Sequence, residues 1–430
     1  MKSLFDGKEI YSWCEDLFPI CRSVAGPGNL ATLKYLKNKA PDIEIKGFKS
    51  GEKVFDWEVP REWHIEEAWI KDQAGNEIVN FKNNNLHVMN YSDSVNEFIT
   101  YDELIKHLYS IPSRPNAIPY VTSYYSRDWG FCIQESSKNL LKKDIKYHVY
   151  IDSEFIDGEM VFGEAFIQGE SNKEILLSTY ICHPSMANNE LSGPVVTTAL
   201  LKKITNESNH YSFRFLFLPE TIGSIAYISS NLLQLQKNVI AGYVITCVGD
   251  NNIFSFLPSR AGQTISDRAA RHLLRNDAKS FKEYKWIHRG SDERQFCAPG
   301  VDLPIASIMR SKYGEYDEYH TSDDDLDFIS ADGLAGSANL IYQTIKAIDK
   351  NCYPKVNFLC EPMLSKRGLY PEKSTADTQG IVQVMMDFIS YSDGKRDLFE
   401  IADLIDQPIW NLYDLLYSLK DKEIIETNFL

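Results

Sequence analysis

The sequence has no feature of a membrane-spanning protein and little that would indicate secretion. No window of the 430 residues approaches the run of about 18 apolar residues that a membrane span needs. The first residues, MKSLFDGKEIYSW, carry charges early and contain no apolar core of signal-peptide length. The eight cysteines form no CxxC pair and no short disulfide spacing, so we expect reduced thiols. These absences predict a cytoplasmic protein with no membrane partner.

Positive charge is also scarce. Lys and Arg number 45 against 60 Asp and Glu, and the formal net charge is −15. Because contact with phosphate needs clustered Lys and Arg, this balance argues against a general nucleic-acid binder. What is present is an ordinary globular composition, with 43% apolar and 24% charged residues. A chain of this length is too long for one typical core, so two or three domains are expected.

The hydrophobic pattern divides the chain into four stretches. The first, to about residue 42, has a helical pattern. The second, from about residue 55 to 109, is rich in Trp and Asn with short alternating runs, which predicts a small β-rich unit. The third, about 116–350, alternates strand and helix patterns, and the fourth, about 372–430, has three short amphipathic helices that resemble a winged helix. We therefore expect a main α/β domain (1–50 and 116–365), an inserted β-rich domain (51–115) and a winged-helix domain (372–430).

The third stretch determines the expected fold class. Its strand candidates include nearly continuous apolar runs such as residues 174–181, which are typical of strands buried on both faces. Helix candidates follow at residues 193–204, 224–233 and 331–348. This alternation predicts an α/β fold with a mixed, mostly parallel sheet flanked by helices. The strand candidates are residues 147–151, 160–167, 174–181, 213–218, 242–248 and 305–309.

Polar segments follow three of the predicted strands, where ligands bind in open α/β sheets. In the first segment, His183 comes directly after a buried strand and can supply an imidazole ligand. Asn188, Asn189 and Glu190 follow within reach of the same point. The alternative is a hydrogen-bonded loop histidine, and this segment by itself favours neither.

The other two segments add a carboxylate and a second histidine. Glu220 follows the strand at residues 213–218, where it can act as a general base, although the helix dipole by itself explains a glutamate at a helix start. His320 precedes Thr-Ser and an acidic run in the motif HTSDDDLD. An acidic run alone would indicate only a solvated loop, but the histidine in front makes this segment more specific.

The order of these segments resembles the zinc aminopeptidase and glutaminyl cyclase superfamily over about residues 145–350. Its members have a His after a strand, an Asp-Asn-x-Ser-Gly loop, a Glu-Glu pair before a Gly-Ser helix start, an Asp after the next strand and a late His-Thr-x-x-Asp. The segment at His320 is the strongest match, and residues 290–306 resemble the superfamily's Ser-Asp-x-x-x-Phe segment. Over nearly its full length, the chain is similar to bacterial aminopeptidase-like proteins that carry an inserted β-rich domain and a winged helix. Members of that group often accompany polysaccharide-biosynthesis genes.

The resemblance implies a zinc-dependent hydrolase, an aminopeptidase acting on short peptides or aminoacyl amides. The chain departs from the superfamily at three positions: Asn189 replaces the bridging Asp, the Glu-Glu pair is reduced to Glu220-Thr221, and the later Asp aligns near residues 246–247, with Asp250 slightly beyond.

We therefore expect one zinc ion held by His183, His320 and one carboxylate, Glu190 or Asp250, with a two-zinc site as the alternative. Water would attack an amide carbonyl, with Glu220 moving the proton; Glu220 as a ligand is the alternative role.

The resemblance also implies substrate contacts. An aminopeptidase needs a carboxylate that holds the substrate's ammonium group, and Asp292 or Glu293 is the candidate. Arg294 would line the same cleft, and Asn189 is a further candidate for substrate binding. A surface salt bridge explains the charged residues equally well. As a hypothesis, the inserted unit covers the cleft and limits access to short substrates.

Other functions compete with the peptidase. Cys182 neighbours His183, but successive strand side chains point to opposite faces, so a nucleophilic dyad is not expected. The missing Asp and second Glu favour, as an alternative, a degenerate peptidase-like binding protein. A winged-helix regulator is a second alternative, but residues 372–430 carry five Lys or Arg against twelve Asp or Glu, which opposes phosphate binding. We expect no nucleic-acid partner; this segment should pack on the main domain or mediate homo-oligomerisation.

Overall fold

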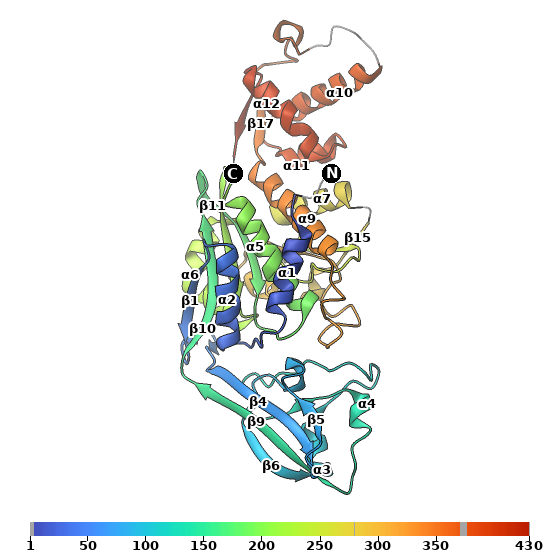
Figure 1. Cartoon of the computed structure of the whole chain (residues 1–430). Helices are drawn as coiled ribbons and strands as arrows, with labels where there is room; N and C mark the ends of the chain where they lie inside the picture. Colours follow the sequence, from blue (N-terminus) through green and yellow to red (C-terminus); the bar gives the residue numbers. More distant parts are fainter. Residues whose placement is uncertain (1–3, 279, 370–375, 430) are drawn as a thin grey trace.

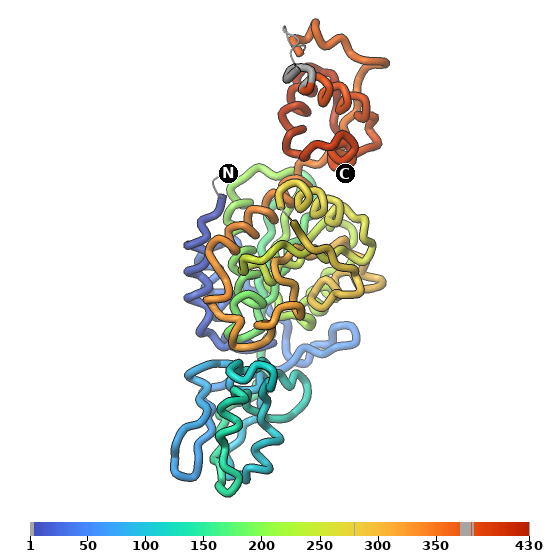
Figure 2. The backbone as a smooth tube through the Cα atoms, turned by 90° about the vertical axis from the view of Figure 1, so that its right-hand side faces the viewer, coloured from blue at the N-terminus to red at the C-terminus, as the bar shows by residue number. Residues whose placement is uncertain are grey.

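The computed structural model describes residues 4–278, 280–369 and 376–429 and shows three units in a row (Figure 1). The α/β unit lies in the middle, the inserted unit at one end and the winged helix at the other, and a view turned by 90° keeps this order (Figure 2). The predicted α/β fold with a C-terminal winged helix is confirmed. None of the helices in the described part of the chain has the length and apolar character needed to cross a membrane.

The central sheet has eight strands in the order β1-β10-β12-β11-β13-β16-β14-β15. Four neighbouring pairs are parallel and three are antiparallel, which confirms a mixed sheet. The strands are β1 (Glu44–Lys49), β10 (Glu159–Ile167), β11 (Ser171–Tyr180), β12 (Tyr211–Leu218), β13 (Val239–Val244), β14 (Phe254–Leu257), β15 (Phe281–Glu283) and β16 (Ile305–Met309).

Helices cover both faces of this sheet, which explains its apolar strands. Along β12, Phe213, Phe215 and Phe217 pack into one core cluster, whereas Leu216 and Leu218 pack into the other, as the period of two requires. The first face is covered by α1 (Gly7–Leu17), α2 (Pro27–Lys39), α5 (Ser192–Ile204), α7 (Ile265–Asp277) and α9 (Ala331–Asp349), and the second by α6 (Ile222–Asn238) and α8 (Glu293–Phe296).

One predicted strand is displaced. The sequence indicated a strand at residues 242–248, but β13 begins at Val239 and ends at Val244. Beyond it, Cys247 has a left-handed backbone with φ 53°, which is incompatible with extended structure. The strand therefore ends before the residues at which the family resemblance aligns an acidic ligand.

The inserted unit has its own antiparallel sheet, in the order β5-β4-β9-β6. The strand predicted at residues 147–151 lies in β9 and pairs with β4 and β6, not with the central sheet, so this sheet extends beyond the range 51–115. A hydrophobic pattern shows which face of a strand is buried but does not name its partner strand. The elements here are β2 (Lys53–Val54), β3 (Trp57–Glu58), β4 (Glu62–Asp72), β5 (Glu77–Asn80), η1 (Asn85–His87), β6 (Val95–Thr100), α3 (Tyr101–Leu104), η2 (Ile105–His107), β7 (Leu108–Tyr109), β8 (Phe131–Cys132), α4 (Glu135–Lys138) and β9 (Lys146–Ile156).

The winged helix packs against α7 of the central unit. Arg268 donates two hydrogen bonds to Asp397, at 3.0 and 2.6 Å, and Nδ1 of His272 lies 2.7 Å from Asp403. The segment at the end of the described chain forms a strand, β18, that pairs with β17. The elements are β17 (Tyr353–Val356), η5 (Ser365–Arg367), α10 (Ala376–Tyr391), α11 (Leu398–Leu404), η6 (Ile409–Leu412), α12 (Tyr413–Asp421) and β18 (Ile425–Asn428).

Candidate active site

Parallel strands bring two of the predicted site residues to the same edge of the sheet. β11 ends at Tyr180 and β12 at Leu218, in register with each other, so His183 and Glu220 leave the sheet side by side. Nε2 of His183 lies 3.8 Å from an Oε atom of Glu220. The third member, His320, comes from the long loop between β16 and α9, and its ring centroid lies 5.4 Å from that of His183.

The Nδ1 side of His183 is held by a buried ion pair. Nδ1 lies 3.0 Å from Oε2 of Glu190, and Oε1 of Glu190 lies 3.6 Å from Nε of Arg22. Nε of Arg22 also donates to the backbone carbonyl of His183 at 2.9 Å. The side chains of Arg22 and Glu190 are both fully buried. This arrangement fixes the ring and leaves Nε2 facing Glu220.

Cys182 lies next to this pair. Its Sγ is 3.4 Å from Nδ1 of His183 and accepts the backbone N–H of Glu220 at 3.2 Å. Ligand atoms of Cys182, His183 and Glu190 all lie within 4.8 Å of one another. Burial raises the pKa of the Cys182 thiol to about 11, so this sulfur is protonated near neutral pH.

The ring of His320 has a nitrogen with no partner. Its Nε2 is buried and accepts or donates no hydrogen bond. Burial, and then the neighbouring His183, lower the pKa of His320 to about 3, so the ring is neutral. Tyr319 stacks on this ring at 3.9 Å, and the backbone of His320 is left-handed with φ 57°. A buried nitrogen without a partner costs about 1–3 kcal/mol, which a metal ion bound there would offset.

Glu220 is positioned by its neighbours. Its Oε1 accepts the hydroxyl of Ser291 at 2.7 Å. Burial raises the pKa of Glu220, while His183, Ser291 and Arg294 lower it in part. A carboxyl with a raised pKa next to a histidine is the chemical environment of a general base or acid.

Two of the predicted ligands have other partners. Asp250 accepts the amide of Asn188 at 2.9 Å and the backbone N–H groups of Asn252 and Ser311 at 2.8 and 3.0 Å. Its carboxylate therefore organises the loop after β13, outside the Cys182–His183–Glu190 group. Glu190 lies at the site, on the Nδ1 side of His183.

Asn189 lies in a π-helical turn, η3 (Ala187–Leu191), that precedes α5. Its Nδ2 donates to the hydroxyl of Tyr180 at 2.9 Å, and the ring centroid of Tyr180 lies 5.3 Å from that of His183. The amide oxygen of Asn189 is buried with no hydrogen-bond partner. Asn189 and His320 therefore each present a buried polar atom without a hydrogen-bond partner.

The predicted substrate-binding residues 292–294 support the turn at Glu220. Asp292 accepts the N–H of Thr221 at 2.7 Å and the hydroxyl of Ser224 at 2.9 Å, and burial, with Glu220 nearby, raises its pKa to about 7. Glu293 accepts from the N–H groups of residues 290 and 291 and from a tyrosine hydroxyl. Both carboxylates are buried, whereas exposed Arg294 donates to Oγ1 of Thr221 at 2.7 Å.

Two residues that were not named as site residues from the sequence complete the site. The ring of Tyr120 lies 5.2 Å from the rings of both His183 and His320, and its N–H donates to the carbonyl of His320 at 2.8 Å. Asp324 accepts the N–H groups of Asn188 and Asn189 at 2.6 and 2.9 Å, which ties the His320 loop to η3. Asp324 lay within the HTSDDDLD motif, but no local pattern could have indicated Tyr120, which is 200 residues from His320.

The fold is an α/β fold shared with solved aminopeptidases, followed by a winged helix. Residues 11–351 match the model of the family described as a domain of unknown function, DUF4910, and residues 351–427 match a winged helix-turn-helix model. The chain belongs to the DUF4910 family. The resemblance stated from the motifs is confirmed at the level of the fold.

Relatives and solved structures agree. A Clostridium acetobutylicum protein, named as a candidate polysaccharide biosynthesis protein with an aminopeptidase-like domain, is 43% identical over 398 residues, 92% of this chain and 91% of its own. The crystal structure of a candidate peptidase from the same organism has a TM-score of 0.92 at 40% identity and covers 98% of this chain and 96% of that one. The zinc aminopeptidase BSAP of Bacillus subtilis has a TM-score of 0.57 at 12% identity, over 80% of this chain and 95% of that one, and shares the fold.

Proposed function

We propose that the chain is a zinc-dependent hydrolase that cleaves an amide bond in a small substrate. The observation that carries this proposal is the neutral ring of His320, whose buried Nε2 has no partner and which lies beside His183. Neutral imidazole nitrogens are ordinary zinc ligands. The fold shared with the zinc aminopeptidase of Bacillus subtilis supports the same metal.

In this proposal His183 and His320 would hold one zinc ion, and Asn189, whose amide oxygen is buried without a partner, would supply a third donor. Glu190 then has a different role from the one expected. Because its carboxylate lies against Nδ1 of His183 and the guanidinium of Arg22, it orients the ring rather than binding the metal. Asp250 takes no part, since its oxygens already accept three hydrogen bonds.

A zinc ion at this position would polarise the substrate carbonyl and lower the pKa of water. The protein residues do the rest of the chemistry. Glu220 takes the proton from the attacking water and gives it to the leaving amine, as its raised pKa allows. Ser291 holds the Glu220 carboxyl in position, and Tyr120 covers the two histidines and keeps bulk water out.

The test is metal content, measured by mass spectrometry after incubation with zinc and gel filtration. We expect about one zinc per chain, with loss in His183→Ala and in His320→Ala. His288→Ala, an exposed histidine outside the site, is the matched control and should keep the metal. Absence of zinc from the folded wild-type chain would remove the basis of the hydrolase mechanism.

The substrate class follows from the relatives and is part of the proposal. The name of the Clostridium relative refers to polysaccharide biosynthesis, so N-acyl amino sugars join short peptides and aminoacyl amides as candidates. A panel of all three substrate classes, assayed with Glu220→Gln as the inactive control, distinguishes them.

The eight cysteines are free, which agrees with the proposed cytoplasmic location.

A peptidase-like binding protein is the second candidate. The observation in its favour is the neutral amide of Asn189 at the position where the superfamily has a bridging carboxylate. Zinc retention with no hydrolysis of any compound in the panel would support it. The acidic balance of residues 372–430 gives no support to a nucleic-acid-binding regulator.

A further inference from the structure

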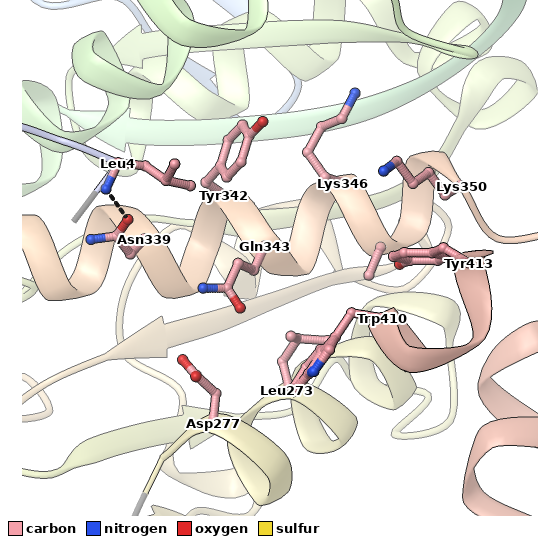
Figure 3. Close-up of a pocket in the computed structure, with 11 residues that line it drawn as sticks. Leu4, Leu273, Asp277, Asn339, Tyr342, Gln343, Lys346, Lys350, Trp410 and Tyr413 are labelled. Carbon is pink, nitrogen blue, oxygen red and sulfur yellow. Dashed lines mark hydrogen bonds between the residues drawn. The ribbon is translucent and has the colours of Figure 1, made fainter. Parts of the chain in front are cut away.

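A pocket lies at the junction of the central unit and the winged helix, apart from the active site. Its volume is about 670 Å³, within the range typical of small-molecule sites. One wall is a face of α9, a second is α7, and η6 and α12 of the winged helix close one end (Figure 3). The lining includes Gln343, Lys350, Asp277, Trp410 and Tyr413.

Several polar groups converge on this pocket without protein partners. Within the described residues, the amide of Gln343, the carboxylate of Asp277 and the indole N–H of Trp410 make no hydrogen bond, and Lys350 has no ion pair. The ammonium of Lys350 lies 4.7 Å from the ring centroid of Tyr413. Lys346, by contrast, is bound to Asp349 at 2.7 Å.

An exposed side chain such as Asp277 or Lys350 often bonds only to water, so neither would indicate a site by itself. The pocket differs because Gln343 and Trp410 are partly buried and line the same cavity as both charges. Gln343 lies on α9 and Lys350 is the C-cap of that helix, seven residues further on, so both side chains lie toward the same face. The close-up shows Gln343 between Asp277 and the Lys350–Trp410–Tyr413 end (Figure 3).

We propose that this pocket binds a nucleoside phosphate. The indole of Trp410 lines the pocket, where an aromatic ring can stack on a base. The amide of Gln343 offers both a donor and an acceptor to the edge of a base, and the carboxylate of Asp277 can accept hydrogen bonds from a ribose diol. Lys350, whose ammonium contacts the Tyr413 ring, supplies a positive charge for the phosphate.

The site has a regulatory consequence. Trp410 and Tyr413 belong to the winged helix, whereas Gln343, Lys350 and Asp277 belong to the central unit. A ligand that contacts both units stabilises their docked arrangement, because it binds the folded junction and not the separated units. The winged helix then acts as part of a small-molecule sensor.

Calorimetry on the full chain tests this, with UMP and AMP as probes and uridine and inorganic phosphate as the separated halves. We expect binding of at least one nucleotide, weaker binding of uridine, and weaker binding still of phosphate. Trp410→Ala should weaken nucleotide binding roughly tenfold or more, through lost stacking, and Trp410→Phe should restore most of it. Lys350→Ala should weaken nucleotide binding and make the affinity depend less on salt concentration. Lys37→Ala, an exposed lysine on α2, is the matched control.

Three results would overturn the proposal. The first is that neither nucleotide binds at millimolar concentration. The second is that the wild type and Lys350→Ala bind the nucleotide equally well. The third is that free amino acids bind more tightly than nucleotides. Trp410 packs partly against the core, so Trp410→Ala could unfold the junction. The surface variant Lys350→Ala and the conservative Trp410→Phe keep the test decisive in that case.

Discussion

Oε2 of Glu190 lies 3.0 Å from Nδ1 of His183, and this contact distinguishes the two nitrogens of the histidine ring. A carboxylate on Nδ1 directs Nε2 toward Glu220, 3.8 Å away. The same relationship turns Glu190 from a predicted ligand into a residue that orients one.

Replacing Glu190 should therefore weaken zinc binding without abolishing it. Glu190→Gln keeps a hydrogen-bonding side chain but loses the charge that fixes the ring, and loss of such an orienting partner costs on the order of 10- to 100-fold in metal affinity. Competition with a zinc chelator measures it. A loss as complete as that of His320→Ala would instead make Glu190 a direct ligand.

The buried pair of Arg22 and Glu190 should show strong coupling in stability. Arg22→Met alone leaves the Glu190 carboxylate buried without its cation and should cost about 3–5 kcal/mol. The double variant with Glu190→Gln should recover part of this loss, because no uncompensated charge is left. Urea denaturation of the two single variants and the double variant measures the coupling, and additive losses would show that the two charges act independently.

Asn189→Asp should tighten zinc binding by about tenfold or more. The amide oxygen of Asn189 is buried without a partner, and a carboxylate in its place adds a charged donor to the two histidines. Isothermal titration with zinc measures the affinity and the stoichiometry. Unchanged affinity would show that Asn189 does not face the metal, and two zinc ions per chain would show that this single residue sets the metal count.

Glu220→Gln should separate proton transfer from metal binding. We expect hydrolysis to fall by about 10²- to 10⁴-fold while zinc content stays at the wild-type level. Ser291→Ala should have a smaller effect in the same direction, because Ser291 only positions the Glu220 carboxyl. If Glu220→Gln also loses zinc, Glu220 is a ligand.

Away from the site, Glu164 should make stability depend on pH. Burial by itself would raise the pKa of Glu164, but hydrogen bonds from Lys46 and Tyr227 and the charge of Arg214 hold the pKa below its usual value. A lowered folded-state pKa means stability that is present above the unfolded-state pKa and lost as pH falls through the folded one. Glu164→Gln should cost about 3 kcal/mol at pH 7 and progressively less below about pH 4. Urea denaturation measures the free energy of unfolding at pH 7 and below about pH 4, and an equal loss under both conditions would contradict this prediction.

Much of the fold could be predicted, because its signals are local. Two strands were predicted from the apolar run at residues 174–181 and the alternation at 213–217. The polar segments that follow these strands indicated His183 and Glu220. Parallel pairing makes neighbouring strands end at one edge, so order along the chain was enough to bring these two residues together.

The partners of these residues were not predictable in the same way. Glu190 and Asp250 are both acidic residues near a strand end, and only three-dimensional packing shows that one contacts His183 and the other the loop after β13. Tyr120 reaches His320 through the inserted unit, across 200 residues of sequence.

By itself, the sequence determined the α/β class, the winged helix and the order of the site segments, because periodicity and strand-end motifs are written in short windows of the chain. Tertiary structure decided which sheet takes the strand β9, which nitrogen of His183 is free and which nitrogen of His320 has no partner. These are properties of contacts between distant segments, and contacts depend on packing geometry that no local pattern of residues contains.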